Sequence, residues 1–265
     1  RSTLFPYTTL FRSLADLSLT IDEGEFITVI GSNGAGKSTF LNAISGDLKV
    51  DEGQIIIDGQ DVTRKTAWQR AAQVARVFQD PMAGTCESLS IEENLALAWQ
   101  RGQRRHLLRR AVRASQRALF REKLATLGLG LEARLTDRMG LLSGGQRQAV
   151  SLLMASLQPS RLLLLDEHTA ALDPKTAAFV LRLTDQIVQS QGLTALMVTH
   201  SMRQALDHGT RTVMLHQGQV VLDVRGAERA ALDVPDLLAM FSRVRGEAVD
   251  DKLLLGSAKD RKSVV

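Results

Sequence analysis

Cysteine, tyrosine and tryptophan are scarce in this sequence, whose 265 residues include one cysteine, one tyrosine and two tryptophans. With Cys86 alone, no disulfide can form within the chain, and such usage is typical of a reducing compartment such as the cytosol. The sequence also lacks a run of about 18 apolar residues, so it predicts no membrane-spanning helix. No secretory signal, repeat or low-complexity tract is evident. We therefore expect one globular domain with a short appendage.

The two ends of the chain do not continue the hydrophobic pattern of its middle. Residues 1–13 match the translation of a common sequencing adapter, and residues 260–265 match the translation of its reverse complement up to a stop codon. We predict that both ends are adapter-derived, because native disordered tails would not be related in this way. They carry four basic residues against one acidic residue, which leaves the remainder nearly neutral and without a charge signal for nucleic acid. The native N-terminus and its first strand are then expected to be missing.

A glycine-rich stretch near the N-terminus matches the spacing G-x-x-x-x-G-K-[ST]. It lies between a predicted strand over 26–30 and a predicted helix over 39–45. A phosphate-binding loop requires this context, whereas a glycine-rich turn that matches the spacing by chance does not. Glycines let several backbone N–H groups surround one anion, and the helix start adds a positive dipole. We predict a phosphate-binding loop in which Lys37 contacts the terminal phosphates and Ser38 ligates Mg²⁺. Its residues are Gly31, Ser32, Asn33, Gly34, Ala35, Gly36, Lys37, Ser38 and Thr39.

Two acidic residues close a run of leucines over 162–165. Such a run predicts a strand that is buried on both faces. Asp166 and Glu167 at its end would lose hydration unless a cation compensates, and Mg²⁺ held with Ser38 would supply that charge. His200 directly follows another predicted buried strand and is expected on the same side of the sheet.

A second candidate anion site lies at the start of a predicted helix over 147–157. Ser143 can cap this helix, and the glycines that follow it leave backbone N–H groups uncovered. Taken alone, this would be an ordinary loop. Gln79, which follows a short predicted strand, is also a weak signal by itself, although ligands bind at such strand ends.

Other segments give structural predictions. Alternation over 14–21 predicts a half-buried strand, and Asp58–Gly59 predicts a hairpin turn. Ser90 begins a capping-box pattern that opens a helix over 92–101. The arginine-rich stretch over 104–123 predicts a long amphipathic helix with a solvated basic face, which we favour over an RNA- or lipid-binding patch.

In the C-terminal half, Asp173 and the following proline predict a helix start, and Gly192 predicts its end. A hairpin over 212–224 should turn at Gln217–Gly218. A short amphipathic helix is expected over 236–241.

With these residues in view, the chain resembles the ATP-binding subunit of a bacterial ABC transporter of the importer type, from residue 14 to about residue 241. The order of the motifs makes the resemblance specific. These motifs are the phosphate loop at 31–39, the Q-loop Gln79, the signature at 142–146, Asp166 with Glu167, the D-loop at 171–173 and the switch residue His200.

The resemblance implies an α/β P-loop NTPase fold of the ABC-ATPase type, with a mainly parallel central sheet, an antiparallel β subdomain and an inserted α-helical subdomain. The implied parts are an ATP-binding core at 14–80 and 153–225, a helical subdomain with the signature at 81–152, and a C-terminal helix and tail at 226–259.

The resemblance also implies an ATP hydrolase with ATP and Mg²⁺ as cofactors. The resemblance implies that Glu167 of this chain polarises the attacking water, and that Lys37 and His200 contact the phosphates. The implied ligands of Mg²⁺ are Ser38, Gln79 and Asp166.

ATP would be sandwiched in a head-to-tail homodimer, where the signature of one subunit closes the phosphate loop of the other. The residues implied to act across this interface are Ser143, Gly144, Gly145, Gln146 and Asp173. Closure would drive separate permease subunits, with the chain peripheral on the cytoplasmic face of the inner membrane. An extracytoplasmic solute-binding protein is implied as an indirect partner, and nucleic acid is not.

Three departures from the family pattern stand out. His168 replaces the usual proline, Ala170 replaces the usual serine, and Ala149 and residues 154–156 replace an arginine-bearing pattern. Together with residues 80–85, they resemble a subgroup of importers linked to aromatic or branched-chain amino acids. The aromatic residue that normally stacks on adenine belongs to the missing N-terminus, so ATP binding is expected to be weaker than in a full-length chain.

Two other functions remain as alternatives. A soluble ABC-type ATPase that acts on nucleic acid or ribosomes usually carries two ATP-binding halves, whereas this chain has one set of motifs. A regulator without turnover would not need Glu167. The transported solute is set by partner subunits, and a separate ATPase chain favours import over export.

Overall fold

The computed structural model describes residues 14–103 and 114–245. Both predicted adapter segments lie outside this described part. The first half of the arginine-rich stretch, residues 104–113, also lies outside it, so only the second half of the predicted basic helix can be located.

Six strands within the described ranges form one central sheet with the order β4-β5-β6-β1-β7-β8. Neighbouring strands are parallel except β7 and β8, which pair antiparallel. The predicted class, an α/β fold with a mainly parallel sheet and an antiparallel part, is confirmed. The strands are β1 (Phe26–Gly31), β4 (Val74–Val77), β5 (Leu162–Asp166), β6 (Ala195–Val198), β7 (Arg211–His216) and β8 (Gln219–Arg225), with a separate hairpin of β2 (Ile56–Ile57) and β3 (Gln60–Asp61).

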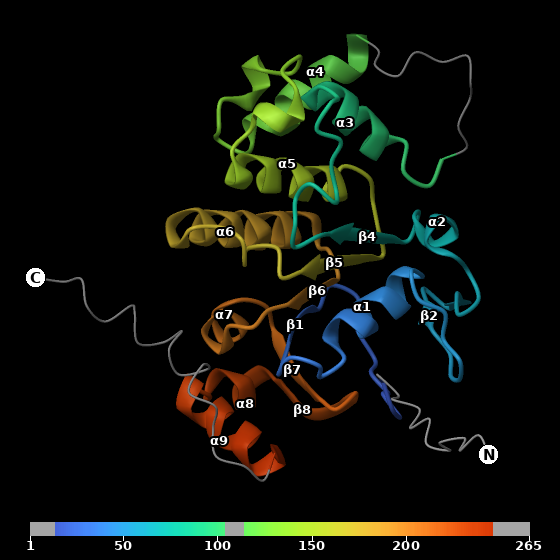
Figure 1. Ribbon diagram of the computed structural model, residues 1–265, viewed down its shortest axis with the longest axis vertical. Coiled ribbons are helices and arrows are strands. Elements are labelled where there is room, and N and C mark those ends of the chain that lie inside the picture. Colours follow the sequence, from blue (N-terminus) through green and yellow to red (C-terminus); the bar gives the residue numbers. More distant parts are fainter. Residues whose placement is uncertain (1–13, 104–113, 246–265) are drawn as a thin grey trace, which may run out of the picture.

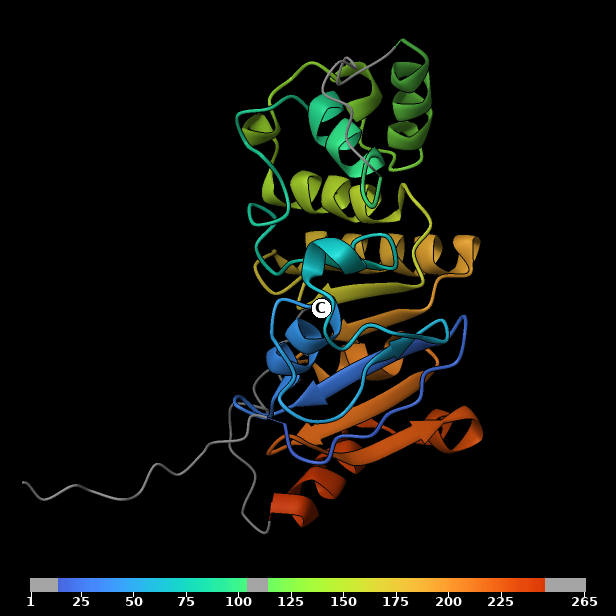
Figure 2. The ribbon, with the colours of Figure 1, turned by 90° about the vertical axis from the view of Figure 1, so that its right-hand side faces the viewer.

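The helices lie on both faces of the sheet and at its two ends. Figures 1 and 2 agree in placing α3, α4 and α5 at one end of the molecule, beyond α6, and α8 and α9 at the other end. The helices are α1 (Lys37–Ser45), α2 (Ala67–Arg70), α3 (Ile91–Trp99), α4 (Ala114–Ala125), α5 (Gly144–Ser156), α6 (Pro174–Gln191), α7 (Met202–Asp207), α8 (Gly226–Ala230) and α9 (Val234–Arg245).

The leucine-rich strand β5 lies inside the sheet between β4 and β6, as its uniform hydrophobicity predicts. Its side chains alternate between two apolar clusters. Leu163 and Leu165 pack with residues of α5 and α6, whereas Leu162 and Leu164 pack with residues of α1. Apolar side chains cover both faces of β5, so no polar side chain is exposed along its run of leucines. Polar residues come only after this run, at the carboxyl end of the strand.

Helix boundaries follow the predicted capping residues closely. Ser90 caps α3 through a capping box with Glu93. Asp173 caps α6, and Gly192 ends that helix in the left-handed conformation. These signals depend on residues within one turn of the helix end, and therefore local sequence suffices to predict them.

The two predicted hairpins are also confirmed. Asp58 and Gly59, at the turn between β2 and β3, have φ values of 52° and 71°. Gln217 and Gly218, at the turn between β7 and β8, have φ values of 48° and 79°. Positive φ at both central residues is typical of the tight turns that match the twist of a hairpin.

The predicted strand over 14–21 is wrong. Leu17, Leu19 and Ile21 are half-buried and pack against the core, as the alternation predicts, but the segment forms no strand. Its backbone meets the β7–β8 turn through one hydrogen bond, from Ala15 N to Gly218 O at 3.0 Å. Alternation of apolar and polar residues indicates which side chains are buried. A strand also requires a neighbouring strand whose backbone N–H and C=O groups are free to pair with it.

Candidate functional site

The glycine-rich loop joins the end of β1 to the start of α1, which confirms the predicted strand–loop–helix context. A methyl group on Gly31 would overlap the carbonyl oxygen of Leu215 in β7. Gly34 and Gly36 have φ values of 77° and 101°, where side chains are strained. The loop therefore needs glycine at these positions for two separate reasons, close packing and backbone conformation.

Lys37 bends back over this loop. Its side chain is buried, with 5% of the residue exposed, and Nζ donates to Gly31 O at 2.8 Å and Ser32 O at 3.1 Å. Burial lowers the pKa of Lys37, while the charges of Glu167 and Asp166 raise it in part. The ammonium group thus faces both the loop and the carboxyl end of β5.

The carboxyl ends of β5 and β6 bring two predicted residues into contact. Glu167 Oε1 lies 2.6 Å from His200 Nε2, and the Glu167 side chain is 10% exposed while that of His200 is 47% exposed. Glu167 has φ of 45°, in the left-handed region. Because carboxyl ends of parallel strands share one edge of the sheet, this pair lies on the same side as the end of β1 and its loop.

Asp166 already has a cationic partner within the chain. Arg76 of β4 donates from Nη2 to Asp166 Oδ2 at 2.6 Å, and its Nη1 lies 2.7 Å from Asn42 Oδ1 and 3.0 Å from Asp47 Oδ2. The guanidinium therefore supplies part of the compensating charge, and the expectation that Mg²⁺ also contributes charge here stays a prediction. An arginine in an otherwise apolar strand was the available signal, and sequence reasoning missed it.

Gln79 follows β4 at the same edge of the sheet and is exposed. The residue before it is tied to the signature helix, because Gln148 of α5 donates from Nε2 to Phe78 O at 3.1 Å. Gln148 is fully buried. The structure thus places Gln79 on a segment that is linked both to β4 and to α5.

The signature segment caps its own helix. Ser143 Oγ accepts from Gln146 N at 3.3 Å, and Gln146 Oε1 accepts from Ser143 N at 3.1 Å, which forms a capping box. The helix begins at Gly144 rather than at residue 147, so both glycines belong to its first turn. A methyl group on Gly145 would overlap Thr176 Cγ2. This glycine therefore lets the start of α5 lie directly against the start of α6.

Asp173 lies beside the signature segment, at the exposed N-terminus of α6. Its Oδ1 accepts from Thr176 N at 3.1 Å, and hydrogen bonds with Thr176 lower the pKa of Asp173. The chain thus forms two groups of predicted residues. One joins Lys37, Asp166, Glu167 and His200 at the sheet edge, and the other joins the signature segment and Asp173 at the starts of α5 and α6.

His168 is a buried polar residue next to the first group, with 2% of its surface exposed. Its Nε2 lies 2.9 Å from Thr184 Oγ1 in α6. Burial, aided by the charge of nearby His208, lowers the pKa of His168 to about 4. The ring is therefore neutral near pH 7. The sequence showed this residue only as a departure from a family pattern and gave no contact for it.

The oxygen atoms of Ser38 and Asp166 are the hard donors that Mg²⁺ prefers. The described residues hold no cluster of three or more histidine, cysteine or acidic residues that could cage a metal ion. A site of few protein oxygens fits an ion that keeps several waters and is shared with substrate phosphates, which is the usual situation of Mg²⁺.

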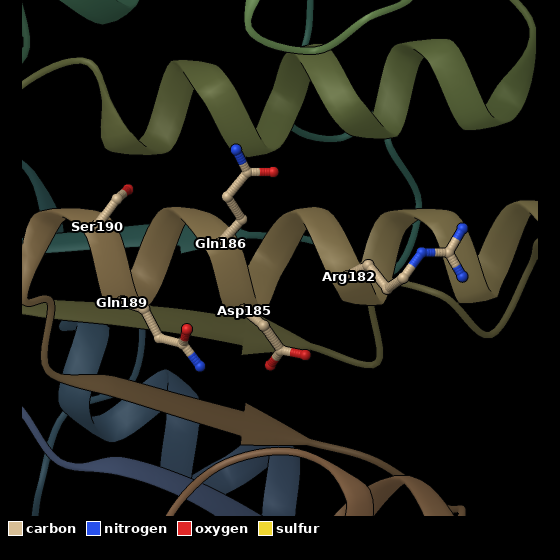
Figure 3. Close-up of a pocket in the computed structure, with 5 residues that line it drawn as sticks. All are labelled: Arg182, Asp185, Gln186, Gln189 and Ser190. Carbon is tan, nitrogen blue, oxygen red and sulfur yellow. The ribbon is translucent and has the colours of Figure 1, made fainter.

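A shallow pocket on α6 does not resemble a binding site. Its lining side chains fan out from one helix in different directions and converge on no common point (Figure 3). They are Arg182, Asp185, Gln186, Gln189 and Ser190. None of them was predicted as a site residue.

The profile of the family described as ABC transporter matches residues 14–170. The chain is 47% identical over 226 residues to the tyrosine transport ATP-binding protein of Clostridioides difficile, covering 85% of this chain and 89% of that protein. It is 34% identical over 209 residues to the spermidine/putrescine import ATP-binding protein PotA of Protochlamydia amoebophila, covering 78% of this chain and 52% of that protein.

Among solved structures, the chain is similar to the dimeric ATP-binding cassette MJ0796 in a post-hydrolysis state bound to ADP and Pi. The TM-score is 0.68 with 29% identity, covering 80% of this chain and 90% of the other. In the described part of this chain, no helix combines the length and apolar character that crossing a bilayer requires.

Proposed function

Because this chain belongs to the ABC transporter family, as its ATP-binding and ATP-hydrolysing subunit, we propose that it powers import of an amino acid through separate permease subunits. The similarity to a tyrosine transport ATP-binding protein over most of both chains supports the amino-acid class. In this proposal the chain is a peripheral subunit on the cytoplasmic face of the membrane, and a solute-binding protein delivers the amino acid to the permease.

In the proposed mechanism the phosphate loop binds the β- and γ-phosphates of ATP through its backbone N–H groups. Lys37, already held over the loop by Gly31 O and Ser32 O, adds a positive charge at the terminal phosphate. Ser38, Asp166 and Gln79 would hold Mg²⁺, which would supply positive charge beside the phosphates. The contact of Arg76 with Asp166 Oδ2 keeps this carboxylate oriented at the end of β5.

The 2.6 Å contact between Glu167 and His200 carries the hydrolytic part of the proposal. A carboxylate that is mostly buried, next to a cationic loop and open to solvent on the histidine side, is placed to orient a water for attack on the γ-phosphate. His200 would hold the carboxylate and contact the same phosphate. The chemistry is positioning and charge neutralisation, so no covalent intermediate on the chain is needed.

The signature segment would act on ATP bound to a second copy of the chain. Ser143 and Asp173 are exposed, and the signature packs on the start of α6 in its own chain. The solved cassette that this chain resembles is described as dimeric. We propose a homodimer in which the helical subdomain, residues 81–152, presents its signature to the partner's phosphate loop, with Ser143, Gly144, Gly145 and Gln146 facing the nucleotide.

A Glu167→Gln variant tests the proposed chemistry. It should bind ATP and form an ATP-dependent dimer, while hydrolysis falls by at least about 100-fold because the amide cannot act as a base. Glu122→Gln on the exposed face of α4 is the matched control and should keep normal turnover. Unchanged hydrolysis in Glu167→Gln would remove this residue from the mechanism.

The solute class needs a separate experiment. The chain is reconstituted with its permease and solute-binding protein, and ATP hydrolysis is measured with aromatic amino acids, branched-chain amino acids and polyamines. Stimulation by an amino acid is the expected result. Stimulation by polyamines alone would overturn the amino-acid proposal and leave the ATPase assignment intact.

A further inference from the structure

The backbone at Glu167 has a conformation that its surroundings must impose. A φ of 45° is in the left-handed region, which is uncommon for residues other than glycine and which here lies outside the two hairpin turns. On one side, Glu167 N donates to Val198 O of β6 at 3.0 Å. On the other side the chain continues into His168, and Glu167 O accepts from Ala170 N at 2.9 Å.

The hydrogen bond of His168 has a defined direction. Thr184 Oγ1 lies 2.8 Å from Val180 O, to which it donates its only proton. The same oxygen must therefore accept from His168 Nε2 at 2.9 Å. The ring carries its proton on Nε2 and acts as a donor. An apolar side chain of similar size could fill the space, but it could not make this bond.

Thr184, the acceptor of the hydrogen bond from His168, lies on a helix that is firmly packed in the core. Thr184 lies in the middle of α6, 1% exposed, and that helix is capped at both ends by Asp173 and Gly192. Val180 and Leu183, on the same helix, are buried in the core. A hydrogen bond from His168 to this helix therefore ties the residue after Glu167 to a rigid element.

We propose that His168 is a positioning residue for Glu167. Its ring, anchored to Thr184, holds the left-handed turn that aims the Glu167 carboxylate at His200 and the phosphate loop. This inference rests on the proposed role of Glu167 in hydrolysis. The usual residue at this position in the family pattern is proline, whose ring restrains the backbone. In this chain the hydrogen bond of His168 would provide the restraint instead.

The test compares two substitutions of the same residue. His168→Leu removes the donor and keeps the volume, and turnover should fall about 10- to 100-fold with the KM for ATP changed less than about twofold. His168→Gln places an amide donor at a similar reach and should restore turnover to within about fivefold of the original chain. A purely structural residue would not show this split between kcat and KM together with rescue by a donor.

The acceptor provides the matched variant. Thr184→Val keeps the shape and removes the oxygen, so it should lower turnover about as much as His168→Leu. The double variant His168→Leu with Thr184→Val should be no worse than either single change, because the two residues form one bond. If His168→Leu fails to fold, His168→Gln and Thr184→Val carry the test on their own.

A background without hydrolysis separates this inference from the proposed function. In Glu167→Gln, adding His168→Leu should leave ATP affinity and ATP-dependent dimerisation unchanged, because the effect passes through the carboxylate alone. Loss of ATP binding in that background, or normal turnover in His168→Leu alone, would overturn the positioning role. Normal turnover in Glu167→Gln alone would instead overturn the proposed function, whatever the His168 variants do.

Discussion

The sheet-edge group and the signature segment differ in how they satisfy their polar atoms. Lys37, Asp166 and Glu167 are largely buried, and the two carboxylates depend on partners from distant parts of the chain, Arg76 and His200. The signature segment is partly exposed and bonds to itself through its capping box. The first group is therefore assembled by folding of one chain, whereas the second is a preformed surface that can await a second chain. Substitutions in the two regions should therefore affect different properties of the protein.

The largest effect is expected at Lys37. Lys37→Met removes the buried charge that we propose to face the terminal phosphate, and ATP affinity should fall on the order of 1000-fold, about 4 kcal/mol. Lys49→Met, an exposed lysine after α1, is the matched control and should bind ATP normally. Titration calorimetry with ATP and Mg²⁺ measures both. Binding by Lys37→Met within tenfold of the original chain would show that the sheet-edge group does not hold the phosphates.

The next effect is on stability as pH falls. The pKa of His168 is lowered from 6.5 to about 4 by burial. Between these values the unfolded chain binds a proton at this residue and the folded chain does not, so stability is lost on acidification, by about 3 kcal/mol in all. Denaturant unfolding of nucleotide-free protein from pH 7.5 to pH 4.5 measures it.

His168→Gln is the control for this pH dependence, because it keeps a donor and cannot titrate. The difference in unfolding free energy between the two chains should shrink or reverse in favour of the variant toward pH 4.5. Parallel curves would mean that His168 does not resist protonation in the folded state.

A smaller effect is expected in the signature segment. Gly145→Ala places a methyl group against Thr176 Cγ2 and should destabilise the chain by about 2 kcal/mol, because Thr176 must leave its rotamer or the starts of α5 and α6 must separate. Gly144→Ala is the matched control, since a methyl group there meets only Leu172 Cδ2 at 3.6 Å, an ordinary contact. Equal unfolding free energies for the two variants would contradict the tight packing of Gly145.

The smallest effect is expected at the cap itself. Ser143→Ala should cost about 1 kcal/mol of stability through loss of the helix cap. Ser143→Asn retains a capping oxygen and should keep the stability, yet it should lower ATP-dependent dimerisation if the hydroxyl contacts the partner's nucleotide. Full dimerisation and hydrolysis by Ser143→Asn would exclude the proposed contact of this residue.

Local signals predicted much of the fold and of the candidate site. The glycine-rich loop joins a strand to a helix as its spacing predicted, and the caps at Ser90, Ser143 and Asp173 form as expected. Each of these features depends on residues within a few positions of one another, where backbone geometry fixes the relation between sequence and structure. The segment over 14–21 shows the limit, because its pattern described burial correctly and strand pairing wrongly.

The sequence by itself determined most strands and helices, the caps of α3, α5 and α6, and the two hairpin turns, since these follow from short-range geometry. Only the tertiary structure decided how the charges are balanced. Arg76 and Asp166 are 90 positions apart and meet because β4 and β5 are neighbours. His168 forms a hydrogen bond with Thr184 because α6 packs beside the turn that follows β5. Such contacts leave no periodic trace in a sequence, because strand order and helix packing, rather than spacing along the chain, bring the partners together.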